Sequence, residues 1–170
     1  MNEQLQTAVT ALKERFGGKE YLFRDEVSLI LAPEQIVEAC RMLRDEFEFD
    51  MLNEETAVDY WPELEPRFNV VYRVRSLRQN LILGLRVPLT GNEPSMPSIE
   101  AIYPNANWFE RELWDLFGIR FEGHSDLRRI LMPYEWEGHP LRKDYPLGYE
   151  EVQFTFNFDE IDQRKPYAKE

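Results

Sequence analysis

Two neighbouring runs of alternating apolar residues constrain the fold of this chain more than any other feature. From 68 to 75 every second residue is apolar, and from 81 to 87 leucine and valine recur at the same spacing. A short connection, 76–80, joins the two runs. Because a period of two is that of a β-strand with one buried face, the pattern predicts an antiparallel hairpin.

The segments before this hairpin predict helices and strands that belong to the same sheet. Apolar residues recur at helical spacing over 5–16, where Gly17 ends them, and again over 36–47. Residues 27–31 alternate as a strand, and a less regular strand is expected within 49–61. The order of these elements predicts an α+β fold. Helices pack on one face of a small, mostly antiparallel sheet, and an extended C-terminal segment follows.

The composition argues against several classes of protein. With 170 residues, of which 43% are hydrophobic, the chain is long enough for one domain with a core. A net charge of -12 argues against binding to nucleic acid and against unaided binding to an anionic membrane. No run of about twenty apolar residues occurs, as a membrane span needs. The first residues lack the basic and apolar regions of a secretory signal.

The cysteine content limits the cofactors that this chain can carry. Cys40 is its only cysteine, and it lies on the apolar face of the helix predicted over 36–47, which indicates a core residue. A single thiol supplies neither an internal disulfide nor the four thiolates of an ordinary iron–sulfur cluster. We therefore expect no iron–sulfur cluster in this chain.

The stretch 104–146 holds the densest mixture of aromatic, basic and acidic residues, and a predicted surface loop over 88–97 leads to it. A helix is expected over 107–117, with Asn107 as its cap and Glu110 reaching back to the cap amide. Gly118 can close its C-terminus. One helical face is apolar and carries Phe109, Leu113, Leu116 and Phe117. The opposite, solvent-facing side is expected to carry Trp108, Arg111 and Asp115.

The exposed side of this helix suits a protein partner, because a large aromatic residue among charges gains little from water. The alternative is that Trp108 folds back onto its own domain. Two glycine–histidine turns follow the helix, and each carries a basic pair, Arg128-Arg129 and Arg142-Lys143. These pairs could bind a phosphate-bearing ligand. The simpler expectation is pairing with the nearby carboxylates, namely Glu110, Glu112, Asp115, Asp126 and Asp144.

An enzyme hypothesis rests on four residues of this stretch. His124, Asp126, His139 and Asp144 could form a metal site or an acid–base pair. The HxH and HxxxH spacings that are common in metal sites do not occur, and both histidines adjoin glycines in turn-like segments. Structural histidines are therefore the preferred interpretation. The enzyme alternative stays open and requires His124 and His139 to converge.

The sequence is recognisable within this stretch. ERELWDLFGIRFEGHSDLRRIL and GHPLRKDYP closely resemble the signature of the 30 kDa subunit, also called the C subunit, of proton-pumping NADH-quinone oxidoreductase, which is respiratory complex I. TAVDYW at 56–61 and RFNVVYRVRS at 67–76 are also similar, so the resemblance covers nearly the whole chain. Family members usually have proline after the first histidine, where this chain has Ser125. A serine there restores a free φ angle and an amide donor, which loosens the turn.

The resemblance implies a cofactor-free, non-catalytic structural subunit in the hydrophilic arm of complex I. Its location would be peripheral, on the cytoplasmic side of the bacterial plasma membrane. Its chief partners would be the quinone-site subunit, which resembles the large subunit of nickel–iron hydrogenases, and the terminal iron–sulfur subunit. FMN, the iron–sulfur clusters and quinone would reside in partner subunits. The alternative is the equivalent subunit of a ferredoxin-dependent photosynthetic complex or a membrane-bound hydrogenase.

The domain organisation follows from these expectations. Residues 1–121 form the α+β domain, including the helix 107–117, and residues 122–170 form an extended arm on partner subunits. Alternating phenylalanines within the arm, at 154–158, need a surface to cover them. No catalytic or metal residue is predicted. The residues expected at interfaces or in turns are Trp108, Glu110, Arg111, Arg128, Arg129, His139, Arg142, Lys143 and Asp144.

Overall fold

A computed structural model describes residues 2–24 and 26–146 of the chain. Its main sheet has the strand order β1-β2-β5-β4-β3. The strands are β1 Lys19–Phe23, β2 Glu26–Ile30, β3 Met51–Asp59, β4 Phe68–Ser76 and β5 Leu81–Leu89. All neighbours pair antiparallel except β2 and β5, which pair parallel. The α+β fold class and the mostly antiparallel sheet are confirmed.

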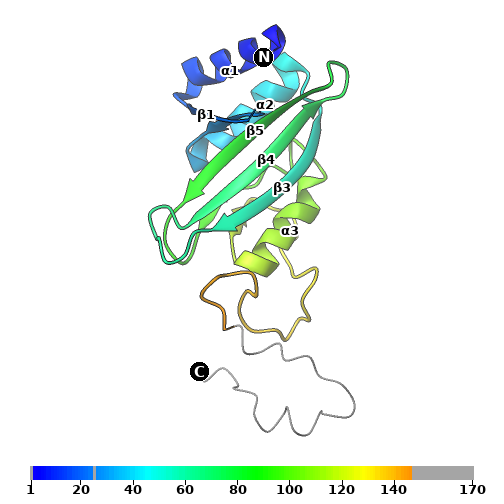
Figure 1. The fold of residues 1–170 in the computed structure, drawn as a ribbon. Coiled ribbons are helices and arrows are strands. Elements are labelled where there is room, and N and C mark those ends of the chain that lie inside the picture. The colour runs from blue at the N-terminus through cyan, green and yellow to red at the C-terminus, as the bar shows by residue number, and fades with distance from the viewer. Residues whose placement is uncertain (1, 25, 147–170) are drawn as a thin grey trace, which may run out of the picture.

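The helices occur where the apolar spacing predicts them. They are α1 Glu3–Phe16, the short 3₁₀ helix η1 Pro33–Gln35, α2 Ile36–Phe47 and α3 Ala106–Phe117. Gly17 ends α1 and Gly118 ends α3, both in the left-handed conformation that glycine adopts most readily. Helices α2 and α3 lie behind the sheet in Figure 1, and α1 lies at one end of it.

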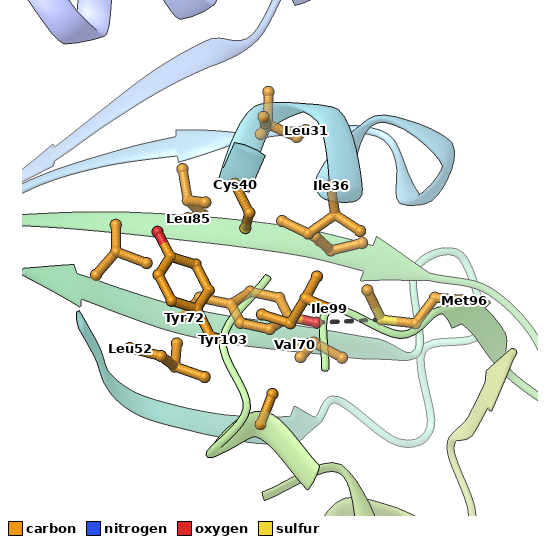
Figure 2. Close-up of a cluster of buried hydrophobic side chains, with 14 of the residues drawn as sticks. Leu31, Ile36, Cys40, Leu52, Val70, Tyr72, Leu85, Met96, Ile99 and Tyr103 are labelled. Carbon is orange, nitrogen blue, oxygen red and sulfur yellow. Dashed lines mark hydrogen bonds between the residues drawn. The ribbon is translucent and has the colours of Figure 1, made fainter. Parts of the chain in front are cut away.

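The core fills the space between the sheet and these helices. Figure 2 shows part of it, and the side chains come from three directions. Leu31, Ile36 and Cys40 come from the α2 side, and Leu52, Val70, Tyr72 and Leu85 from the strands. Met96, Ile99 and Tyr103 come from the segment that precedes α3. Cys40 is fully buried, and burial raises the pKa of its thiol, so it is the core residue that the sequence predicts.

The predicted hairpin is confirmed, with β4 and β5 paired from Phe68 opposite Leu89 to Ser76 opposite Leu81. The loop expected over 88–97 is corrected in part. Its last residues form β6 Ser95–Pro97, which pairs parallel with β7 Arg120–Glu122. This small second sheet joins the segment before α3 to the segment after it. The segments that flank the two ends of α3 are thereby joined to each other.

The predicted N-terminus of α3 is wrong in detail. Asn105 is the N-cap and makes no side-chain cap bond. The side chain of Asn107 instead donates to Glu100 at 2.8 Å and to Ser125 at 3.3 Å. Glu110 is fully buried and accepts bonds from the Ser98 hydroxyl and the Ile99 amide. Tertiary contacts with 98–100 therefore take the place of the expected capping box.

A candidate docking site around helix α3

Helix α3 is enclosed on two sides. Leu113 and Phe117 face the core and are nearly fully buried. The residues after β7, 123–146, loop beside and below α3 in Figure 1, as the yellow and orange segment, and bond to Arg111 and Asp115 on the other side of the helix. The side predicted to face solvent is therefore largely covered. Arg111 is 8% exposed and Asp115 is 0% exposed, which corrects the prediction for both.

Asp115 is the acceptor that fastens this segment to the helix. Its Oδ2 accepts three consecutive backbone amides, those of Ile130, Leu131 and Met132, at 2.8–3.0 Å. Its Oδ1 pairs with Arg129 at 2.6 Å. Burial opposes ionisation of this carboxyl, but the amides and the guanidinium outweigh it and lower its pKa. An ionised, buried and fully bonded carboxylate is a structural anchor.

Two arginines complete the fastening of the first turn. Arg111 donates to the carbonyl oxygens of Arg128 and Arg129, each at 3.1 Å. Arg129 also donates to the carbonyls of Trp136 and Gly138. The predicted pairing of Arg129 with a carboxylate is thus observed. Arg128 is exposed and pairs with Asp126 at 2.8 Å, which contributes little in water.

The second turn packs on the C-terminal end of α3. The Nδ1 atom of His139 lies 2.9 Å from the carbonyl oxygen of Asp115. Arg142 donates to the carbonyls of Phe117 and Gly118. These groups satisfy carbonyls that the end of a helix leaves without partners. Burial lowers the pKa of His139, with a further contribution from the charges of Arg142 and Arg129.

Near its end the segment is bonded to the domain a third time, by Arg67 and Asp59, which the sequence analysis did not predict as site residues. Arg67 is fully buried and donates from two nitrogens to the two carboxylate oxygens of Asp59. It also forms an ion pair with Asp144 at 2.6 Å. The Lys143 amide donates to Asp59 at 2.9 Å, whereas the Lys143 side chain is exposed. Asp144 lies 77 positions after Arg67. No local spacing pattern indicates a pair so far apart in the chain.

The first histidine lies in a different environment from the second. His124 Nε2 lies 3.1 Å from the carbonyl oxygen of Asn107, and its Nδ1 accepts the Asp126 amide. The Ser125 amide and hydroxyl both donate to Glu100, at 2.9 and 2.7 Å. The donor that serine restores is therefore used, and these bonds hold the turn that was expected to loosen.

The two histidines do not converge. His124 binds the carbonyl of Asn107, and His139 binds that of Asp115, eight residues later on α3. At 1.5 Å per residue these carbonyls lie roughly 12 Å apart. Ligands of one zinc ion lie within about 4 Å of each other, so the geometry argues against a shared metal. Within residues 2–24 and 26–146, no group of three or more potential ligands could hold a metal ion.

Helix α3 and the segment bonded to it both present apolar side chains to the outside. Trp108 is 60% exposed with its ring 5.2 Å from the Arg111 guanidinium, so it does not fold back into the domain. Leu131, Tyr134 and Leu141 are 61%, 95% and 52% exposed. We call these four side chains the α3 apolar face. None of the described helices is long and apolar enough to cross a membrane.

The comparisons with known proteins agree with these observations. Residues 29–151 match the family model described as the 30 Kd subunit of respiratory-chain NADH dehydrogenase. The C subunit of NADH-quinone oxidoreductase from Roseiflexus sp. (strain RS-1) is 51% identical over 87% of this chain and 86% of its own length. The C subunit from Geobacter sulfurreducens is 43% identical over 82% and 88%.

A longer relative and two solved structures extend the comparison. The C/D subunit of NADH-quinone oxidoreductase from Methylococcus capsulatus is 40% identical over 98% of this chain, which covers 30% of that relative. A trypsin-resistant fragment of Nqo5 superposes with a TM-score of 0.66 at 28% identity, over 73% of this chain and 99% of the fragment. One chain in the structure of the membrane-bound sulfane sulfur reductase, an archaeal respiratory membrane complex, shares the fold. It superposes with a TM-score of 0.72 at 24% identity, over 85% of this chain and 87% of that chain. The resemblance seen in the signature is confirmed, and the chain belongs to the family of the 30 Kd subunit of respiratory-chain NADH dehydrogenase.

Proposed function

We propose that this chain is a non-catalytic, cofactor-free structural subunit in the hydrophilic arm of proton-translocating NADH-quinone oxidoreductase. It lies on the cytoplasmic side of the bacterial plasma membrane and braces the quinone-site subunit and the terminal iron–sulfur subunit. FMN, the clusters and quinone belong to those and other partner subunits. The chain contributes to electron transfer from NADH to quinone by holding these neighbours in place.

One observation carries this proposal, namely the α3 apolar face on a segment that is already fixed. Asp115, Arg111 and Arg67 hold 123–146 on the domain before any partner arrives. Leu131 and Tyr134 are exposed although they lie beside these buried bonds. A surface that is ordered in advance loses less conformational entropy on binding, and exposed aromatic residues are typical of its contacts.

The identity of the first partner has separate support. The Methylococcus capsulatus relative is named as a C/D subunit, and this chain spans 30% of it. Two chains that occur as one polypeptide in a relative are candidates for direct contact. The D subunit is accordingly the partner that the α3 apolar face is proposed to bind first.

The test is replacement of Tyr134, the most exposed residue of this face. Tyr134→Asp in the tagged chain removes the aromatic contact and places a charge in the interface. We expect much less co-purification of other subunits from mild-detergent membranes, and an equal loss of NADH-dependent quinone reduction. Because Tyr134 is almost fully exposed, the fold of the chain itself should stay intact.

A matched control is Leu77→Asp, which changes a 56% exposed leucine just after β4. Co-purification and quinone reduction should remain at the level of the unmodified chain. Equal behaviour of Tyr134→Asp and Leu77→Asp would contradict the proposed docking. Recovery of the tagged chain as a lone soluble protein would contradict the proposed function as a whole.

A further inference from the structure

The face of the main sheet that points away from α2 and α3 is uncovered in the described part of the chain (Figure 1). Direct pairing places Tyr21 beside Ser28, Ser28 beside Gly84, and Gly84 beside Arg73 across four strands. The two central residues of this row are small. The result is a groove of about 510 Å³, with Tyr21 and Phe23 on one side and Arg73 and Ile82 on the other.

Glycine at position 84 is required for this groove. A Cβ atom at Gly84 would lie 2.3 Å from the Ser28 hydroxyl, well inside van der Waals contact. The floor of the groove is therefore formed by backbone and by the Ser28 side chain. The close approach of the Ser28 side chain to the Gly84 backbone accounts for a glycine in a strand interior, where glycine otherwise weakens the strand.

Arg86 lies in this groove without a carboxylate partner among the described residues. Its guanidinium carbon is 4.6 Å from the centroid of the Tyr21 ring. Its Nε atom is buried and has no hydrogen-bond acceptor in the described structure. Arg73, in the same groove, is paired with Glu26 at 2.6 Å and with Glu54 at 3.8 Å. A guanidinium in a groove with no carboxylate partner among the described residues suits an incoming carboxylate.

Strand β1 borders the groove and forms one edge of the sheet. All of its residues are exposed, including Leu22 at 62% and Phe23 at 56%. Exposed sheet edges leave backbone donors and acceptors unpaired, and proteins usually protect them with charges or a covering element. This edge carries charges only at its start, at Lys19 and Glu20, and then presents Tyr21, Leu22 and Phe23 in succession. An apolar edge of this kind suits addition of another strand.

We propose that an extended, acidic segment of a partner subunit adds to the free edge of β1 and places a carboxylate on Arg86. The incoming backbone bonds to β1, and apolar side chains of the segment cover Tyr21 and Phe23. This interface is distinct from the α3 apolar face and goes beyond the proposed function. It depends on that function only because a multi-subunit assembly must supply the segment.

The test uses a photoreactive residue in the assembled complex. Leu22 is replaced by p-benzoylphenylalanine, the complex is purified in mild detergent and irradiated, and cross-linked peptides are identified by mass spectrometry. We expect a cross-link to a partner-subunit segment that carries aspartate or glutamate. The same photoreactive residue at Leu77, which is exposed just after β4 and separated from β1 by strands β2 and β5, should not capture this segment.

The role of Arg86 is tested in the same complex. Arg86→Glu should lower the yield of the Leu22 cross-link by about tenfold, the effect of one lost charge-assisted contact. Arg86→Met keeps an apolar stem over Tyr21 and should lower the yield similarly, whereas Arg86→Lys should retain most of it. Exchanging the captured acidic residue for arginine should restore the yield in the Arg86→Glu complex. Thermal melts of the purified chains check that each variant is folded.

Several outcomes would overturn the proposal. A recovered complex without a cross-link at Leu22 would leave the proposed function intact and refute the β1 interface. Capture of the chain's own residues 147–170, or of a second copy of the chain, would identify a different occupant. An unchanged yield of the Leu22 cross-link in folded Arg86→Glu would show that Arg86 does not pair with a carboxylate of the segment. Absence of co-purifying subunits with the unmodified chain would refute both proposals.

Discussion

The Asp115 side chain alone makes four of the bonds that hold the segment 123–146 against helix α3. Its carboxylate is fully buried and accepts three amides and a guanidinium. Removal of the carboxylate leaves those donors, and the charge of Arg129, without their partner. A buried donor that loses its acceptor destabilises the fold more than the removal of both partners does. Asp115 should therefore contribute strongly to the free energy of unfolding.

We predict that Asp115→Ala lowers the free energy of unfolding of the isolated chain by about 3–5 kcal/mol, the usual cost of breaking a buried charged network. Glu112→Ala, on the exposed side of the same helix, should change it by no more than about 0.5 kcal/mol. Urea unfolding at neutral pH measures both. Similar values for the two variants would mean that the Asp115 bonds are not the anchor.

A second residue-scale feature is a pair of carboxyl groups within the core. Glu55 on β3 is 4% exposed, and neither of its oxygens has a hydrogen-bond partner in the described structure. Burial, and then the charge of Glu110, raise the pKa of Glu55 well above its usual value. Burial also raises the pKa of Glu110 to about 7. Tyr72 and Cys40 face this pair from β4 and α2, and His124 lies 3.9 Å from Glu110.

This pair predicts a loss of stability as the pH rises. A carboxyl whose folded pKa exceeds its unfolded pKa stabilises the fold when protonated, and that contribution is lost as the pH rises through the folded value. For Glu110, with a pKa moved from 4.5 to about 7, the loss falls between about pH 4.5 and 7. At roughly 1.4 kcal/mol per unit, it amounts to roughly 3 kcal/mol. Ionisation of Glu55 adds to it in the same direction.

The variant Glu110→Gln isolates this effect, because the amide oxygen can still accept the Ile99 amide. Urea unfolding of both proteins at pH 5, 6, 7 and 8 should give similar stabilities at pH 5. At pH 8 the variant should be the more stable one. The general effect of the net charge is common to both proteins and cancels in the difference. Parallel pH profiles would show that Glu110 does not titrate in this range.

At the scale of the elements, the C-terminal glycine of α3 links the helix to the second turn. Gly118 has φ 71°, and a Cβ there would lie 2.5–2.6 Å from atoms of His139 and Arg142. Gly17, at the end of α1, has φ 68° with no atom within 4 Å of such a Cβ. The two positions share the backbone conformation and differ in what surrounds them.

We predict that Gly118→Ala is clearly more destabilising than Gly17→Ala, and that it also exposes the second turn. Backbone strain, about 1–2 kcal/mol, is common to both variants, whereas displacement of His139 and Arg142 occurs only in the first. Limited trypsin digestion should cleave Gly118→Ala after Arg142 and Lys143 faster than Gly17→Ala. Equal cleavage rates would show that the second turn is not held through this contact.

The elements differ in how far the sequence predicts them. Strand β4 alternates strictly, and β5 alternates except around Gly84, because one face of each is buried; α1 and α2 show the helical period for the same reason. Strand β1 has no such signal, since all its residues are exposed, and β6 is too short for a period to be visible. The end of α3 was predictable from Gly118, but its start depends on contacts with 98–100.

The sequence predicted the types of residue in the candidate site better than the partners that those residues contact. The sequence indicates that Arg129 pairs with a carboxylate, and the structure supplies Asp115. Arg142 binds helix carbonyls, and Asp144 pairs with Arg67 from before β4. The unpartnered carboxyl of Glu55 follows from the irregular pairing of β3, where the register shifts between Leu52 and Glu54. Such a shift reverses which residues face the core, and no periodicity reveals it.

At the scale of the whole molecule, the domain that was expected to end at residue 121 holds the following 123–146 by many bonds. The expected arm therefore begins on its own domain as far as residue 146. Its contacts with partner subunits remain a prediction, and the phenylalanines of 154–158 lie outside the described residues. This arrangement gives the subunit a fixed face from which the rest of the arm continues.

Hydrogen–deuterium exchange of the isolated chain and of the purified complex tests the central claim most directly. The amides of 130–132 should be protected in both, because Asp115 already binds them in the chain alone. The amides of 134, 135 and 137–139 should exchange more slowly in the complex, while those around Leu77 should not change. Protection of 130–132 only in the complex would contradict an anchor formed in advance. Equal exchange of 134, 135 and 137–139 in both samples would contradict docking through the α3 apolar face.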